Sequence, residues 1–84
     1  MVWEITWYPK AFRILKNLPF NLQERIIKRV EKLKDNPFHF LEHFEGRLYK
    51  LQIGDYRALV DMDFENKIIS IQVFGHRGRI YERI

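Results

Sequence analysis

The chain has 84 residues, of which 46% are hydrophobic and 15% aromatic, so we expect one compact domain over residues 1–84 rather than a disordered chain. It has no cysteine, which excludes disulfides, zinc–cysteine sites and thiol catalysis. Its formal net charge of +4 indicates a polyanionic partner, either a nucleic acid or an acidic protein. No apolar run approaches the roughly 20 residues of a membrane span and no signal peptide is visible, so we expect a cytoplasmic protein with no membrane contact.

The first half of the chain predicts one strand followed by two helices. Apolar and polar residues alternate over residues 2–7, which is typical of a strand. Pro9 suits the first turn of a helix, because its missing N–H has no intrahelical partner there, and Pro19 ends or interrupts that helix. Asn21 and Glu24 resemble a capping box that opens a second helix. The second helix carries one apolar stripe, formed by Leu22, Ile26, Ile27, Val30 and Leu33.

Cations crowd the rest of the second helix. Only Glu24 and Glu31 oppose them. The basic residues of this stretch are Arg25, Lys28, Arg29, Lys32 and Lys34. The simpler interpretation is a solvated helix face, and the alternative is a docking surface for RNA phosphates.

The second half of the chain predicts a connector and three strands. Asn36-Pro37 stops the second helix, and residues 38–46 form a connector that closes at Gly46. Alternation on both sides of Gly54-Asp55 predicts a hairpin with a two-residue loop, in which Gly54 takes a positive φ. The pairs expected across this hairpin are Ile53 with Tyr56, Gln52 with Arg57 and Lys50 with Leu59.

A last strand is expected from about Lys67 to His76, after a turn at Glu65-Asn66. The order of elements is then strand, helix, helix and three strands (β-α-α-β-β-β). Strands joined by tight turns are antiparallel. We therefore predict an α+β fold, in which two N-terminal helices pack on one face of a mainly antiparallel four-stranded sheet.

Side-chain alternation places Lys50, Gln52 and Arg57 on one side of this sheet, away from the core residues of the same hairpin. The C-terminal tail follows the strand next to Arg57, so it can bring more polar side chains to the same end of the sheet. These tail residues are His76, Arg77, Arg79 and Tyr81.

The register of the last strand stays open at this level. A two-residue turn at Glu65-Asn66 puts Phe74 and His76 on the Arg57 face. A three-residue turn puts Val73 and Arg77 there instead.

This basic and aromatic cluster suits an RNA phosphodiester. Arginine forks bind phosphate oxygens in a bidentate manner. Preorganised cations stabilise the extra charge of a pentavalent phosphorane, where the loss of one donor typically costs about 10²–10³ in rate. A tyrosine can stack on a base or orient a hydroxyl. The competing interpretation is a set of ordinary exposed charges on a small basic protein.

Other chemistries find little support in the sequence. The stretch from His39 to His43 fits an H-x-x-E-H metalloprotease motif, but such a site needs a helix and a third protein ligand, and this stretch lies in a short connector. Ser70 is the only serine and lies within a strand pattern. No glycine-rich phosphate loop is present. We therefore expect neither a metal nor a cofactor.

Two stretches resemble the RelE branch of the RelE/ParE toxin superfamily: residues 46–57, which read GRLYKLQIGDYR, and residues 73–77, which read VFGHR. The resemblance extends over nearly the whole chain. It implies a RelE-like fold and the toxin of a type II toxin–antitoxin pair. Such toxins enter the ribosomal A site and cut mRNA by attack of a 2′-hydroxyl on the adjacent phosphate. The implied partners are the ribosome, mRNA and a cognate RelB-like antitoxin, with the chain a monomer alone or part of a hetero-oligomer with that antitoxin.

The resemblance also implies roles for individual residues. Lys50 matches a lysine that assists deprotonation and charge balance, and Arg57 matches the arginine that stabilises the phosphorane. Arg77 matches an arginine near the leaving group, and Tyr81 matches a tyrosine that stacks on or orients the nucleotide. The residues expected to bind nucleic acid without a catalytic role are Arg47, Gln52, His76 and Arg79.

Gln52 departs from the pattern, because a well-studied family type has a second catalytic lysine at that position. Cleavage is then slower or relies on Arg47 or Arg79. The alternative function is that of ParE-like members, which share the fold, lack the catalytic set and inhibit DNA gyrase.

Overall fold

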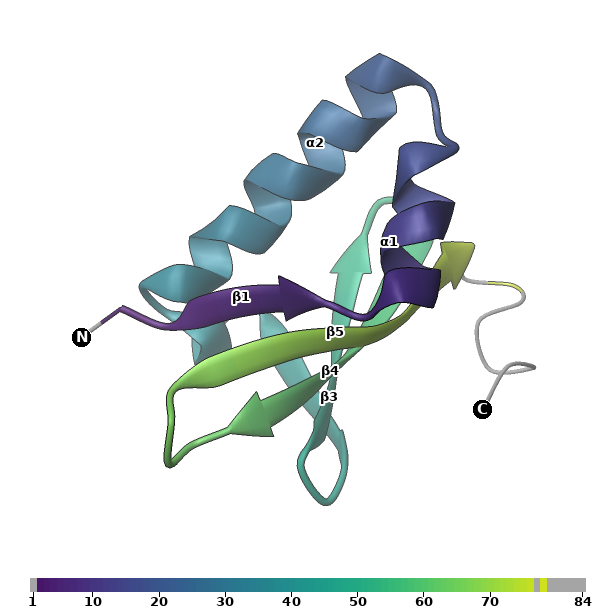
Figure 1. The fold of residues 1–84 in the computed structure, drawn as a ribbon. Coiled ribbons are helices and arrows are strands. Elements are labelled where there is room, and N and C mark those ends of the chain that lie inside the picture. Colours follow the sequence, from purple (N-terminus) through teal and green to yellow (C-terminus); the bar gives the residue numbers. More distant parts are fainter. Residues whose placement is uncertain (1, 77, 79–84) are drawn as a thin grey trace.

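The structure is a computed structural model that describes residues 2–76 and Gly78. It contains two helices on one face of a five-stranded sheet (Figure 1). The strands are ordered β1-β5-β4-β3-β2; β1 and β5 are parallel and every other neighbouring pair is antiparallel. The elements are β1 (Glu4–Trp7), α1 (Pro9–Lys16), α2 (Phe20–Glu31), β2 (Leu41–Glu45), β3 (Leu48–Ile53), β4 (Tyr56–Asp63) and β5 (Ile68–His76), with 3₁₀ turns at Lys32–Lys34 and Pro37–His39. The predicted α+β class and the two-helix layer are confirmed. No helix within the described residues is long and apolar enough to cross a membrane.

The expectation of four strands is wrong, because part of the expected connector forms β2. This strand pairs with β3 through a turn in which Gly46 has a φ of +55°. Four of its five residues are exposed, so apolar and polar side chains have no buried face along which to alternate. Pairing with β3 satisfies backbone groups that a free connector would leave to water. Backbone hydrogen bonding to β3 therefore stabilises this strand, and the pattern of its side chains gives almost no indication of a strand in the sequence.

The two prolines act as predicted, but the capping box does not form. Pro9 occupies the first turn of α1, and Pro19 separates the two helices. α2 begins at Phe20, one residue before the expected cap at Asn21, and no side chain caps it. The Pro19 carbonyl instead accepts hydrogen bonds at 3.0 Å from two backbone N–H groups of the first turn of α2.

Gln23 on α2 closes the end of α1. Its side-chain amide donates to the backbone carbonyls of Lys16 at 3.1 Å and Leu18 at 2.7 Å. Carbonyls at the end of a helix lack intrahelical partners, so a buried amide can replace water there. Gln23 also takes a place in the buried stripe of α2, whereas Ile27, which was expected there, is 40% exposed.

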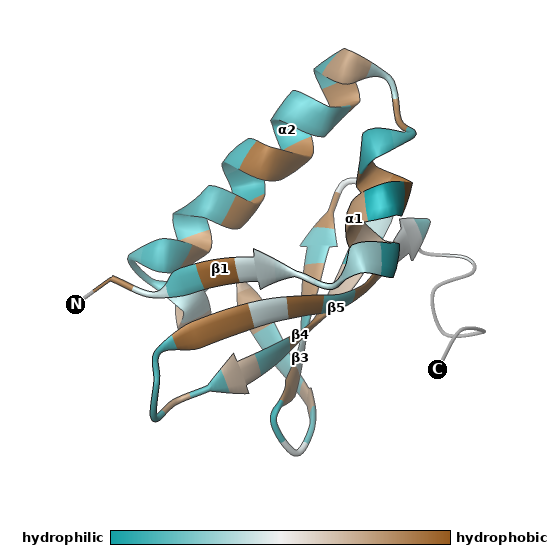
Figure 2. Cartoon of the chain, viewed as in Figure 1, coloured by the Kyte–Doolittle hydropathy of each residue, from teal (hydrophilic) through white to brown (hydrophobic). Residues whose placement is uncertain are grey.

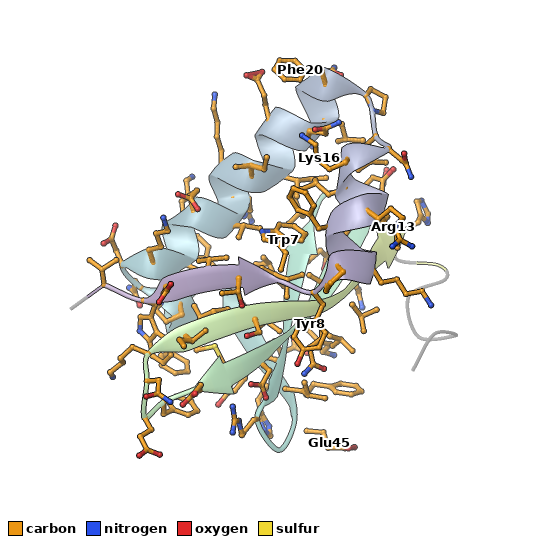
Figure 3. All side chains as sticks on the ribbon, viewed as in Figure 1. Trp7, Tyr8, Arg13, Lys16, Phe20 and Glu45 are labelled. Atoms are coloured by element: carbon orange, nitrogen blue, oxygen red, sulfur yellow. The ribbon has the colours of Figure 1, made fainter. Side chains whose placement is uncertain are left out.

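The core lies between the helices and the sheet. Trp7 points from the end of β1 toward this layer (Figure 3), and its ring packs edge-on against Phe12 of α1 and Phe74 of β5. The fully buried side chains come from both helices, from the 3₁₀ turn at Lys32–Lys34 and from β3, β4 and β5; they include Leu15, Ile26, Leu33, Leu51, Val60, Met62, Ile69, Ile71 and Phe74. This packing leaves the opposite face of the sheet without helices.

The central hairpin has the predicted register. Ile53 pairs with Tyr56, Gln52 with Arg57 and Lys50 with Leu59. Gly54 has a φ of +58°, the left-handed region that glycine enters without a steric penalty.

A β-bulge resolves the register of β5. From Asp63, which pairs with Ile68, the ladder follows the register of a two-residue turn. The register then shifts by one residue between Leu59 and Val60, so that Leu59 pairs with Val73. Such bulges re-aim side chains. The register of a two-residue turn therefore holds from Ile68 to Ile71, and the register of a three-residue turn holds from Val73 to His76.

Candidate functional site

A pocket of about 310 Å³ lies on the face of the sheet away from the helices. Its lining comes from three adjacent strands, β2, β3 and β4, and from the turn before β2. Because side chains alternate along a strand, the residues that flank core positions in the hairpin project to this face. The lining residues are Phe40, Glu42, Lys50, Gln52 and Arg57. The predicted convergence of Lys50, Gln52 and Arg57 is therefore observed.

Lys50 and Glu42 form an ion pair across β2 and β3, with 3.0 Å between Lys50 Nζ and Glu42 Oε1. The hydrogen bond from Lys50 and its positive charge hold the pKa of Glu42 below its usual range, and the charge of Arg57 lowers that pKa further. The carboxylate thus lies in the field of both cations. The lining residues that the structure describes carry two positive charges and one negative charge, so this pocket attracts anions.

Arg57 is half-buried at the centre of this face. Its cross-strand partners are Gln52 on β3 and Gly75 on β5. Gly75 is buried and has no side chain, so β5 places no side chain beside Arg57 at this pair. Leu59, two residues along β4 on the same face, is only 2% exposed. We attribute its burial to the aliphatic stems of the neighbouring long side chains, because arginine and lysine cover apolar surface while their charged ends stay near water.

Two of the residues predicted to bind nucleic acid lie away from the pocket. Arg47 donates to Asp61 at 2.7 Å, and this contact raises the pKa of Arg47. Asp61 is four residues from Arg57 along β4, or about 13 Å. His76 pairs with Tyr56, one position beyond the Arg57 pair, so alternation turns its side chain to the other face of the sheet, where it contacts the Tyr56 ring.

Three predicted site residues, Arg77, Arg79 and Tyr81, lie outside the described residues. β5 ends at His76, the position next to the pairing of Gly75 with Arg57. The last described residues of the chain are therefore at the pocket end of the sheet.

Two pocket residues, Phe40 and Glu42, were not among the predicted site residues. In the sequence, Glu42 stands out only as part of the H-x-x-E-H motif. The stretch from His39 to His43 forms the end of a 3₁₀ turn and the start of β2, so its two histidines do not share a helix face. His43 Nε2 instead lies 2.9 Å from the Gly46 carbonyl oxygen. Glu42 could have been found only by pairing β2 with β3.

The pocket has the donors needed to hold a phosphate group. Arg57 offers a planar fork of N–H groups, Lys50 an ammonium and Gln52 an amide. Glu42 partly neutralises Lys50 until an anion competes for that ammonium.

We predict that Glu42→Gln tightens binding of a phosphate-bearing ligand by about twofold to fivefold, the scale of one exposed ion pair. The ligand is oligothymidylate, whose bases do not titrate in acid, and affinity is measured by fluorescence anisotropy at constant ionic strength. Because the folded-state pKa of Glu42 is depressed, its charge is present at pH 7 and is lost only as the pH falls below the usual value of 4.5. Wild-type affinity should therefore rise below that pH.

The variant should show a smaller acid-dependent rise, because only its other carboxylates still take up protons. Glu65→Gln, in the exposed turn before β5, removes the same charge away from the pocket and serves as the control. Equal effects of the two substitutions would show that Glu42 acts only through net charge.

The family model of the ParE toxins of type II toxin–antitoxin systems matches residues 5–81. The fold is similar to that of the archaeal RelE–RelB complex from Pyrococcus horikoshii, with a TM-score of 0.78, 24% identity, and coverage of 94% of this chain and 99% of that chain. It is also similar to the RelBE2 toxin–antitoxin complex from Mycobacterium tuberculosis, with a TM-score of 0.81, 20% identity, and coverage of 92% of this chain and 100% of that chain. The isolated RelE toxin of E. coli matches with a TM-score of 0.75, 14% identity, and coverage of 88% of this chain and 83% of that chain. At these identities the structural likeness establishes a shared fold. None of the curated protein sequences matches the chain significantly.

Proposed function

Because this chain belongs to the ParE toxin family of type II toxin–antitoxin systems, within the RelE/ParE superfamily, we propose that it is a ribosome-dependent endoribonuclease that cleaves mRNA in the ribosomal A site and so inhibits translation. The observation that carries the proposal is the convergence of Lys50, Gln52 and Arg57 on one open pocket. A toxin that acted only by binding would have no need for this group of phosphate donors.

The proposed reaction is an internal transesterification. The 2′-oxygen of one nucleotide attacks the adjacent phosphorus and loses its proton, the bond from phosphorus to the 5′-oxygen breaks, and that oxygen gains a proton. The products are a cyclic phosphate and a free 5′-hydroxyl. Arg57 holds the non-bridging oxygens, whose charge rises in the phosphorane. Lys50 assists deprotonation and balances charge, and Glu42 orients its ammonium.

Arg77 and Tyr81 complete the proposed set, near the leaving oxygen and the base respectively. Support for this assignment comes from the path of β5, which delivers the chain to the pocket end of the sheet at His76. Gln52 donates a hydrogen bond without a charge. Since Arg47 is engaged by Asp61, compensation for the missing lysine falls to Arg79.

The proposed partners are mRNA, the ribosome and a RelB-like antitoxin, all in the cytoplasm. Two of the three similar solved structures described above are toxin–antitoxin complexes, which supports an antitoxin as the regulator of this chain in a hetero-oligomer. With few acid–base groups in the pocket, we expect the ribosome to complete the geometry for cleavage.

The match to the ParE toxins also favours a second candidate function, the inhibition of DNA gyrase. One experiment separates the two. Purified protein is added to mRNA alone, to mRNA on translating ribosomes, and to a gyrase supercoiling reaction. We expect new mRNA 5′ ends, mapped by primer extension, only with ribosomes present, and unchanged supercoiling. Intact mRNA on ribosomes together with blocked supercoiling would contradict the nuclease proposal and support inhibition of DNA gyrase.

A further inference from the structure

A second hollow, of about 230 Å³, lies between α2 and the tip of the central hairpin. Its cations occur at positions i, i+3, i+4 and i+7 of the helical stretch, a spacing that keeps them on one face over about 10 Å. We call these four residues, Arg25, Lys28, Arg29 and Lys32, the α2 basic face. The hairpin contributes Ile53 and Gly54 to the lining. Figure 2 shows hydrophilic segments alternating with hydrophobic ones along α2, as in a helix with one polar and one apolar face.

The carboxylates of α2 lie off this face. At 100° per residue, Glu24 and Glu31 fall about a quarter turn from its centre. Glu31 also forms an ion pair at 2.9 Å with Lys34. The lining residues that the structure describes thus include four cations and no carboxylate. A solvated helix face of mixed charge would not separate its charges in this way.

Arg25 is exposed, and its guanidinium lies beside the tip of the hairpin. A Cβ atom on Gly54 would lie only 3.2 Å from Arg25 Nη2. The glycine that permits the turn therefore also leaves room for this guanidinium. Gly54 directly follows β3, and two residues of that strand, Lys50 and Gln52, line the pocket of Arg57.

Phe40 connects the two hollows. Its ring lies 5.7 Å from the guanidinium carbon of Arg29, a cation–π contact, and it also lines the pocket of Lys50 and Arg57. β2 begins to pair with β3 only at Leu41 and Leu51, so β2 does not extend along the edge at Gln52. A half-buried aromatic ring therefore stands between two groups of cations at an open strand edge.

We propose that the pocket and the α2 basic face form one continuous surface for a single RNA strand. The α2 basic face binds phosphates that flank the linkage held at Arg57, and Phe40 stacks on a base between them. Alternation of cations with an aromatic ring is typical of surfaces that bind single strands, whereas an acidic protein partner requires no ring. This inference rests on the proposed function, because it takes the pocket of Arg57 as the place of the reacting linkage.

The test measures RNA affinity without cleavage. The probe is a 2′-O-methyl oligoribonucleotide of about 12 nucleotides, within the range of about 4–16 that single-strand-binding folds cover. The variant Arg25→Gln/Arg29→Gln is compared with Lys10→Gln/Arg13→Gln, which removes the same charge from exposed positions of α1. Figure 3 shows Arg13 on that helix.

We expect the α2 variant to lose about 1.4 from the slope of log affinity against log salt, which is two phosphate contacts at about 0.7 each. The α1 variant should lose less than half as much. A methylated dinucleotide, which reaches only the pocket, should bind the two variants equally. Circular dichroism and Tm confirm that both variants fold.

An equal loss of slope in the two variants would show that only the net charge matters and would overturn the proposal. Binding of poly-L-glutamate that depends on Arg25 and Arg29, with RNA affinity independent of them, would assign the surface to an acidic protein instead. The nuclease proposal is tested separately. It fails if the wild-type protein leaves mRNA intact on ribosomes, and this result does not depend on the slopes of log affinity against log salt.

Discussion

Replacing Arg57 with alanine is expected to reduce ribosome-dependent mRNA cleavage by about 10²–10³-fold, the typical cost of one preorganised donor to a developing oxyanion. The Arg57 side chain is half-buried in the pocket, where its charge lowers the pKa of Glu42. The measurement is the single-turnover rate of mRNA cleavage on programmed ribosomes. Tm is measured alongside, because Arg57 projects from the side of β4 opposite the core and its loss should leave the fold intact.

Two further variants separate charge, shape and packing. Arg57→Met keeps an unbranched apolar side chain at this position and removes the guanidinium, so it should be as inactive as Arg57→Ala but at least as stable. Arg57→Lys keeps the charge without the planar fork and should recover only part of the rate. A folded Arg57→Met protein with wild-type activity would remove Arg57 from the mechanism. Unfolding of Arg57→Met would assign it a structural role.

Replacing Lys50 with methionine is expected to slow cleavage by about 10²–10⁴-fold, the usual contribution of a positioned general acid or base. Its ammonium is held in the pocket by the ion pair with Glu42 and lies 5.8 Å from the Phe44 ring. The substitution removes the proposed proton carrier and half of the positive charge of the described lining. The pH dependence of the single-turnover rate should flatten in the variant, which loss of packing alone would not cause.

Lys50→Arg tests whether charge is sufficient. Arginine keeps the charge and can pair with Glu42, but it does not exchange a proton at ordinary pH. We expect it to restore binding of oligothymidylate but not the cleavage rate. Lys67→Met, which removes a lysine that packs on the Trp3 ring, is the matched control and should cleave at the wild-type rate. Full activity of Lys50→Arg would limit Lys50 to an electrostatic role.

Local sequence was sufficient to predict the central hairpin and its register. Gly54-Asp55 specifies the turn, and strict alternation around it places Leu51 and Ala58 in the core and Gln52 and Arg57 on the opposite face. Both signals lie within about ten residues, so they do not depend on the rest of the chain. The same locality explains why the prolines at the helix boundaries were interpreted correctly.

Features that depend on distant pairing were not predictable in this way. β2 exists because its backbone groups bond to β3, so Glu42 reaches Lys50 through a pairing that exposed side chains do not encode. The bulge between Leu59 and Val60 is a property of two strands together. Gln23, which is not part of the predicted apolar stripe, is buried because it meets the end of another helix.

The sequence by itself determined the α+β class, the hairpin at the centre of the sheet and the shared face of Lys50, Gln52 and Arg57. It could do so because periodicity and turn chemistry act between near neighbours in the chain. Only the tertiary structure decided that Glu42 and Phe40 join this face, that Arg47 and His76 lie away from it, and that the α2 basic face adjoins it across Phe40. Those relations depend on which strand edges pair and where one helix crosses the sheet, and such contacts between distant segments are set by the packing of the whole domain.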